Sequence, residues 1–129
     1  MSIYRFLALG VSVVALAGCE TFTEPSIVSS EVLLQETSGP SAGALIREDV
    51  SQDFLGGSMY RYWAVNLSPV PVCAKVSLIE TSATTYSFVG ARLVPSGATV
   101  DLGFMDNGGL IEYDLWVPNA SGVCGYPPS

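Results

Sequence analysis

The sequence predicts an all-β fold, a small antiparallel β-sandwich of six to eight strands. Short segments alternate apolar and polar side chains, they are rich in aromatic and β-branched residues, and Gly, Pro and Asn separate them at roughly ten-residue spacing. A length of 129 residues fits a single domain. The pattern also fits an immunoglobulin-like strand order, and a small β-barrel is the alternative architecture.

The individual strands are placed by the alternation of their side chains. Residues 59–67 are rich in aromatic side chains, which favour a pleated surface, and Ser68-Pro69 ends this segment. Residues 72–79 have one apolar face, opposite Cys73. Further strands are expected at residues 84–89, 91–94, 98–104 and 110–117.

Turn signals separate the later strands, at residues 95–97 and at Asp106-Asn107-Gly108-Gly109. Asn-Gly favours a tight hairpin, because both central residues of that turn adopt positive φ readily. Residues 41–54 are ambiguous. Ile46, Val50 and Phe54 have helical spacing, yet Gly43 weakens a helix and the segment is short.

A leader precedes the predicted domain. Arg5 is followed by a run of about twelve apolar or small residues, the length of a signal-peptide core and too short to span a bilayer, which needs roughly twenty. The run ends in Leu16-Ala17-Gly18-Cys19, which resembles the lipobox of bacterial lipoproteins at all four positions. The resemblance covers residues 1–19 only. It implies cleavage before Cys19 and attachment of two or three acyl chains, such as palmitate, to that residue.

The residues after Cys19 suggest how the chain is organised. Glu20, rather than Asp, follows the cysteine, and the resemblance then implies transport to the outer membrane. The polar segment up to Ser30 is expected to be a flexible tether. The predicted division is therefore a signal peptide at 1–18, a lipidated cysteine with its tether at 19–30, and a β-sandwich domain at 31–129.

The charge of the predicted mature chain excludes two classes of partner. Removing the leader leaves four basic and twelve acidic side chains, a net charge of −8. Nucleic acid is held by clustered Lys and Arg, so nucleic-acid binding is not expected. Electrostatic docking on an anionic lipid surface is equally disfavoured. Membrane attachment is therefore expected to depend on the N-terminal lipid.

Cys73 and Cys124 are the two cysteines left after acylation of Cys19, and an oxidising compartment favours a disulfide between them. Cys73 lies opposite the apolar face of its strand. The bridge is therefore predicted to fasten the C-terminal tail across the outside of the sheet, not through the core. The hallmark of immunoglobulin domains is a Trp between two cysteines, whereas Trp63 precedes both, so no family is assigned to the domain.

The sequence offers no clear catalytic machinery. The chain contains no histidine, which removes Ser-His and Cys-His nucleophile activation and the commonest metal ligand. Three sets of polar side chains are the remaining candidates. Lys75 with Ser77 and Glu112 with Asp114 are candidates for a hydrolase, and Asp101 with Asp106 and Asn107 for a calcium site. The simpler interpretation of all three sets is a solvated strand face or a turn. We expect neither enzymatic activity nor a cofactor or metal.

Three aromatic residues are the candidate contacts for a partner. Trp116 falls on the polar face of its strand beside Glu112 and Asp114, as binding hot spots often do, unless the tail after Cys124 covers it. Tyr60 and Tyr62 pose the same choice between partner contact and core packing.

The sequence therefore predicts a non-enzymatic envelope lipoprotein whose β-domain binds a protein partner. It is expected to be tethered to the outer membrane and to face the periplasm. An accessory subunit of an envelope complex is one such role. The alternative function is that of an inhibitor or binder of a secreted enzyme or an envelope polymer.

Overall fold

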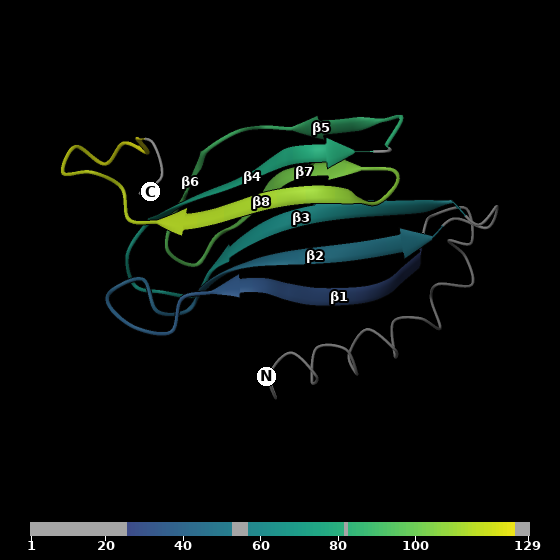
Figure 1. Cartoon of the computed structure of the whole chain (residues 1–129). Helices are drawn as coiled ribbons and strands as arrows, with labels where there is room; N and C mark the ends of the chain where they lie inside the picture. The colour runs from purple at the N-terminus through teal and green to yellow at the C-terminus, as the bar shows by residue number, and fades with distance from the viewer. Residues whose placement is uncertain (1–25, 53–56, 82, 126–129) are drawn as a thin grey trace.

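The computed structural model of the chain describes residues 26–52, 57–81 and 83–125, which form two antiparallel sheets packed face to face (Figure 1). The predicted β-sandwich is confirmed. Its strands are β1 (Ser26–Gln35), β2 (Ala44–Gln52), β3 (Ser58–Asn66), β4 (Val72–Thr81), β5 (Tyr86–Phe88), β6 (Arg92–Val94), β7 (Thr99–Met105) and β8 (Gly109–Trp116). The leader, Cys19 and the first part of the predicted tether lie outside the described residues. None of the described segments forms a helix long and apolar enough to cross a membrane.

The strands divide into a large sheet, ordered β1-β2-β3-β7-β5, and a small sheet, ordered β6-β4-β8. The first three strands form a meander in the large sheet, and after β3 every connection passes to the opposite sheet. An immunoglobulin domain already places its third strand in the opposite sheet, so the immunoglobulin-like order is not the one found. The described strands form two separate sheets, which also rules out the closed barrel.

The turn at Asp106-Asn107-Gly108 does not form the predicted hairpin. It links β7 of the large sheet to β8 of the small sheet, and these two strands do not pair. In the described part of the chain only glycines have positive φ, so Asn107 does not adopt the conformation that the hairpin turn requires. The turn signal therefore marked a chain reversal but not a pair of bonded strands.

Two boundaries differ from the sequence-based prediction. The ambiguous segment is a strand, because β2 pairs along its whole length with β3 and buries Ala44 and Ile46 at a spacing of two. β1 begins at Ser26, so the last residues of the predicted tether belong to the large sheet, where they pair with β2. The folded domain therefore starts earlier than predicted.

The core lies between the sheets and is filled by side chains that alternate along the central strands. Tyr62 and Ala64 of β3 face Val72, Ala74 and Val76 of β4, and all five are buried. Partly buried side chains of β8 pack against this cluster. The alternation expected for the predicted strands at 59–67 and 72–79 is thus confirmed, because only one face of each strand meets the opposite sheet.

A β-bulge in β7 shapes the middle of the large sheet. The register between β3 and β7 shifts where Tyr62 pairs with Gly103 and Trp63 pairs with Asp101. Gly103 has φ of 135°, and a Cβ atom there would lie 2.4 Å from the carbonyl oxygen of Ser87. Only glycine fits this position, so the bulge depends on the residue type.

Candidate functional site on the outer face of the large sheet

The predicted disulfide joins Cys73 to Cys124. Cys73 is fully buried, yet it alternates with Val72 and Ala74 and is not part of the core cluster, so it lies on the outer face of the small sheet. The bridge therefore holds the C-terminal segment against the outside of this sheet, as the sequence predicted. Figure 1 shows that segment looping beyond the end of β8.

Trp116 lies directly opposite Cys73 in the pairing of β4 with β8, and it is only 8% exposed. The indole is therefore not an accessible partner contact in this structure. Its Nε1 atom is buried, and no described residue accepts a hydrogen bond from it. Residues 126–129, most of the tail that was expected to cover Trp116, lie outside the described residues.

The two tyrosine candidates point into the sandwich. Tyr62 is fully buried in the core, and its ring centroid lies 6.0 Å from that of Phe88. Its hydroxyl donates a hydrogen bond to Glu48 Oε2 at 2.7 Å. Tyr60 is partly buried against the same core. Tyr62 is thus not available to a partner, because its face of β3 is the one that meets the small sheet.

The outer face of the large sheet gathers the side chains that commonly mediate binding. We define the outer-face patch as Arg47 of β2, Met59, Arg61 and Trp63 of β3, and Phe104 of β7. Their common face follows from the strand register, because Arg47 lies opposite Trp63 and Arg61 lies opposite Phe104. All five are partly exposed. The patch holds two of the four basic residues that follow Cys19.

Arg61 is the centre of the patch. Its guanidinium carbon lies 5.1 Å from the centroid of the Phe104 ring and 5.9 Å from that of Trp63. Such contacts attract a cation to the ring faces. Asp101 accepts a hydrogen bond from Arg61 Nη1 at 2.5 Å. Two aromatic rings and one carboxylate therefore hold the planar cation in place before any partner arrives.

Arg47 and Trp63, which lie opposite each other on β2 and β3, each carry a nitrogen donor without an acceptor. Arg47 Nε lies 3.2 Å from Asp49 Oδ1, an ion pair whose angles are not those of a hydrogen bond. Asp49 itself is 8% exposed and accepts a hydrogen bond from the Ser30 hydroxyl at 2.6 Å. Neither Arg47 Nε nor Trp63 Nε1 donates a hydrogen bond to a described residue. Both atoms are themselves buried, so they are unsatisfied donors inside the patch and are not open to a ligand in this structure.

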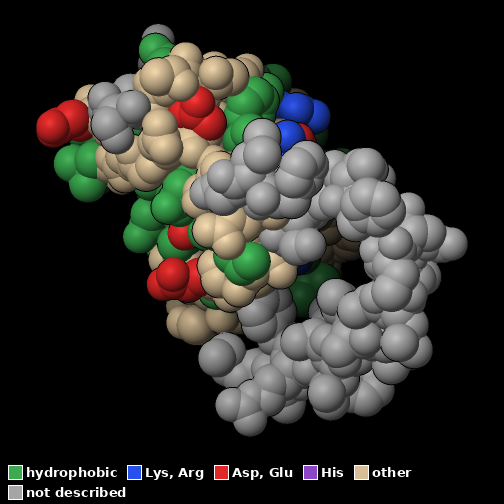
Figure 2. All heavy atoms as spheres, turned by 90° about the vertical axis from the view of Figure 1, so that its right-hand side faces the viewer, with side chains coloured by type: hydrophobic (Ala, Val, Ile, Leu, Met, Phe, Trp, Pro, Cys, Tyr) green, Lys and Arg blue, Asp and Glu red, His purple; other side chains and the backbone are tan. Residues whose placement is uncertain are grey.

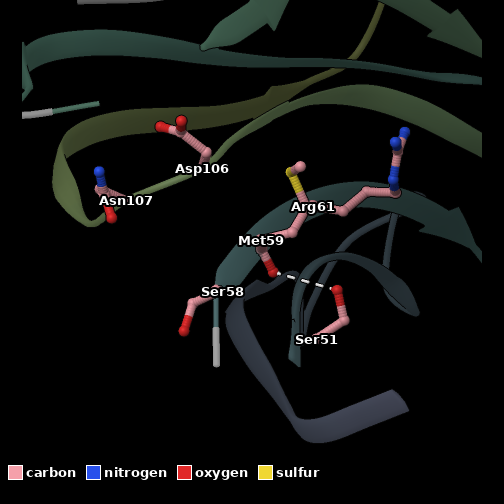
Figure 3. A pocket seen from close by; sticks show the side chains of 7 residues that line it. Ser51, Ser58, Met59, Arg61, Asp106 and Asn107 are labelled. Atoms are coloured by element: carbon pink, nitrogen blue, oxygen red, sulfur yellow. Dashed lines mark hydrogen bonds between the residues drawn. The ribbon is translucent and has the colours of Figure 1, made fainter. Parts of the chain in front are cut away.

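A groove adjoins the patch where the large sheet meets the β7–β8 turn. It has a volume of about 490 Å³. Figure 3 shows Asp106 and Asn107 of the turn on one side and Ser51, Ser58 and Met59 on the other. The groove is thus lined by hydroxyl, amide and carboxylate groups together with the Met59 side chain. Arg61 belongs to both the patch and the groove. A groove of this size accommodates a few side chains of a partner.

Asp106 ties the groove to the neighbouring loop. Its carboxylate accepts hydrogen bonds from the backbone amide of Thr84 at 2.9 Å and from the Thr84 hydroxyl at 2.6 Å. The Thr84 hydroxyl bond is the main reason why the pKa of Asp106 lies below its usual value. The Asp106 amide donates to Thr85 O at 3.0 Å. The groove wall formed by this turn is therefore fastened to the β4–β5 connection.

Sequence reasoning missed the outer-face patch because it weighed Trp116 and the tyrosines instead. The available signal was the alternation of Met59, Arg61 and Trp63 opposite Tyr60 and Tyr62. That alternation separates two aromatic faces but does not say which of them meets the second sheet.

Other predicted polar sets stay apart from the patch or lack further ligands. Lys75 and Ser77 lie opposite Asp114 and Glu112 on the outer face of the small sheet. Within the described residues no group of three or more Cys, Asp or Glu side chains is arranged to hold a metal ion. Comparison with protein-family models, curated proteins and solved structures finds no match to this chain.

Proposed function

We propose that the chain is a lipid-anchored protein of the bacterial envelope, acylated at Cys19, whose β-sandwich binds a protein partner through the outer-face patch without catalysing a reaction. The anchor places it at the outer membrane, facing the periplasm, where it serves as an accessory subunit of an envelope complex. Leu16-Ala17-Gly18-Cys19 supports the anchor. The observation that carries the binding role is the placement of Arg61 between Trp63 and Phe104.

Three physical features support a protein partner. Trp and Arg are enriched among the residues that dominate binding energy at protein interfaces. Arg61 is already held by Asp101, so little side-chain entropy is lost when a partner docks on it. All five side chains of the outer-face patch are partly exposed, which leaves them accessible to a partner.

The anchor is tested by the Cys19→Ala variant. Cells are labelled with a palmitate analogue and the full-length protein is isolated. The native sequence is expected to carry the label and to fractionate with membranes, whereas the variant is expected to lose both properties. Label retained by the variant would place the acyl chain elsewhere and contradict the proposed anchor.

The binding surface is tested by photo-crosslinking in living cells. A photoreactive amino acid replaces Phe104 in the patch, and the control replaces Glu112, which is exposed on the outer face of the small sheet. The Phe104 position is expected to yield a discrete adduct with an envelope protein, which Trp63→Ala weakens. Equal adducts from both positions would contradict a role for the patch, and an adduct with a soluble secreted enzyme would favour the inhibitor function.

A further inference from the structure

The chain enters the sandwich at a defined end. Ser26 pairs with Gln52, Gln52 pairs with Ser58, and the β7–β8 turn lies at the same end (Figure 1). We call this the tether end, defined by the starts of β1, β3 and β8 and the ends of β2, β4 and β7. Six residues lie between Cys19 and Ser26, so seven Cα–Cα steps join them. Whatever its conformation, such a segment spans at most about 25 Å.

Because the tether is short, the two ends of the sandwich differ in how close they can lie to the bilayer. β3 has nine residues, which corresponds to a length of roughly 30 Å from one end of the domain to the other. If Cys19 is held at a bilayer, the tether end is kept next to the lipid while the opposite end is free to point away. A short tether also gives the domain a high local concentration at the surface, so that a weak contact is populated.

The tether end carries exposed apolar side chains from three strands. Ile27 and Val28 of β1 are 62% and 57% exposed, Ile79 of β4 is 56% exposed, and Leu110 of β8 is 57% exposed. Leu110 lies opposite Glu80, next to Ile79 in β4, so β4 and β8 present their apolar side chains together. Figure 2, which looks onto this end, shows hydrophobic side chains on it with acidic ones between them.

We infer that the tether end rests on the lipid bilayer, with Ile27, Val28, Ile79 and Leu110 in the zone between the headgroups and the acyl chains. This inference rests on the acylation of Cys19 in the proposed function. Exposed apolar side chains also occur at the opposite end, among them Leu67 at 66% and Val117 at 51%, so exposure alone does not select the surface. The tether end is selected because the chain leaves the sheet there, at Ser26, toward Cys19.

The charge of the domain sets which lipids suit this contact. Glu80 is exposed beside Ile79, and the predicted mature chain carries a net charge of −8. Repulsion from anionic headgroups therefore opposes the contact, whereas zwitterionic headgroups do not. The four side chains contribute by removing apolar surface from water, which is independent of headgroup charge. The surface that fits is thus a zwitterionic bilayer.

The test uses the full-length acylated protein in phosphatidylcholine vesicles that contain a spin-labelled quencher lipid. A fluorescent amino acid replaces Leu110 in one sample and Leu67 in the matched control. We expect quenching at Leu110 to be at least about twofold stronger than at Leu67, with a blue-shifted emission. Replacing part of the lipid by phosphatidylglycerol is expected to reduce the difference, and added salt to restore it.

Two failures are distinguishable in this experiment. Equal quenching at the two positions, in protein whose mass shows the acyl chains on Cys19, would overturn the bilayer contact and leave the anchor intact. A mass without acyl chains would overturn the anchor and this inference with it. Ile27→Glu combined with Val28→Glu provides a second check, because it is expected to abolish the quenching at Leu110 while Val117→Glu leaves it unchanged.

Discussion

The carboxylate of Asp101 connects the β-bulge of β7 to Arg61. One oxygen accepts a hydrogen bond from the Gly103 amide at 2.9 Å, and the other accepts one from Arg61 Nη1 at 2.5 Å. The same side chain therefore shapes the backbone of β7 and fixes the cation at the centre of the outer-face patch. Because the two bonds use different oxygens, substitution can separate them.

Asp101→Asn removes the charge but keeps an oxygen that can accept from the Gly103 amide. Both partners of the ion pair are more than one-third exposed, at 37% and 43% of their side chains. Loss of the ion pair is therefore expected to lower the free energy of unfolding by less than about 1 kcal/mol. Asp101→Ala also removes the bond to Gly103 and is expected to cost about 1 kcal/mol more. Urea denaturation measures both, and equal losses would show that the bulge does not depend on this side chain.

Asn66 is expected to be a major contributor to stability. It is fully buried, and its amide nitrogen donates to Val70 O at 2.8 Å and to Val94 O at 2.9 Å. Its side-chain oxygen accepts from the Ser68 amide and hydroxyl. Asn66→Ala removes these four hydrogen bonds at a buried site, so we expect a loss of about 3 kcal/mol. Ser96→Ala, which removes one bond to Ser68 O at a partly buried site, serves as the control with a smaller expected loss. A similar loss in both variants would contradict the importance of the buried amide.

The strands were predictable where one face of the pleat meets the core and the other does not. β4 shows this clearly, because Val72, Ala74 and Val76 point inward. β2 was ambiguous for a geometric reason. Ile46 and Val50 are four residues apart, a spacing that places side chains on one face of a helix and also on one face of a strand. The start of β1 was missed because pairing with β2 includes serine-rich residues that resemble a linker.

The sheet assignment and the site were not predictable from local patterns. Gly97 and Gly108 indicate turns, but a turn does not determine which sheet the next strand joins. Asp101 is near Arg61 only because β7 returns to the large sheet beside β3, forty residues later in the chain. The disulfide was easier to predict, since two cysteines allow a single pairing within the domain.

Tyr62 is expected to make the domain sensitive to alkaline pH. Burial, followed by the hydrogen bond to Glu48, raises the pKa of Tyr62 above its usual value. In the unfolded chain this tyrosine loses its proton above about pH 10, while in the folded chain it stays protonated. The unfolded state then binds fewer protons, so the free energy of unfolding falls as pH rises through that range.

Tyr62→Phe removes this titration and keeps the ring. Above about pH 10 its unfolding free energy is expected to fall less steeply than that of the native protein, by up to about 1.4 kcal/mol per pH unit. Below that pH the variant is less stable by about 1 kcal/mol, because the bond to Glu48 is lost. Guanidinium denaturation at a series of pH values measures both effects. Tyr86→Phe, at an exposed residue, is the control, and matching slopes in the two variants would contradict the assignment to Tyr62.

The disulfide is expected to stabilise the fold and to keep Trp116 covered. The bridge joins residues 51 positions apart, and loop-closure entropy assigns it about 4 kcal/mol. Cys124→Ser frees the C-terminal segment from Cys73, which lies opposite Trp116. In a Trp63→Phe background Trp116 is the only tryptophan of the chain. Its emission is then expected to shift to longer wavelength and to become accessible to a water-soluble quencher, because the indole is 8% exposed with the bridge in place.

Thermal unfolding of the same pair of proteins separates the covering role from the stabilising one. A lower unfolding temperature with unchanged emission would mean that the strands themselves bury the indole and that the bridge acts through the unfolded chain. A red shift at temperatures well below unfolding would mean that the tail covers Trp116 in the folded domain. We expect the red shift, because strand alternation points Trp116 away from the core and toward the side of the small sheet where Cys124 is fastened.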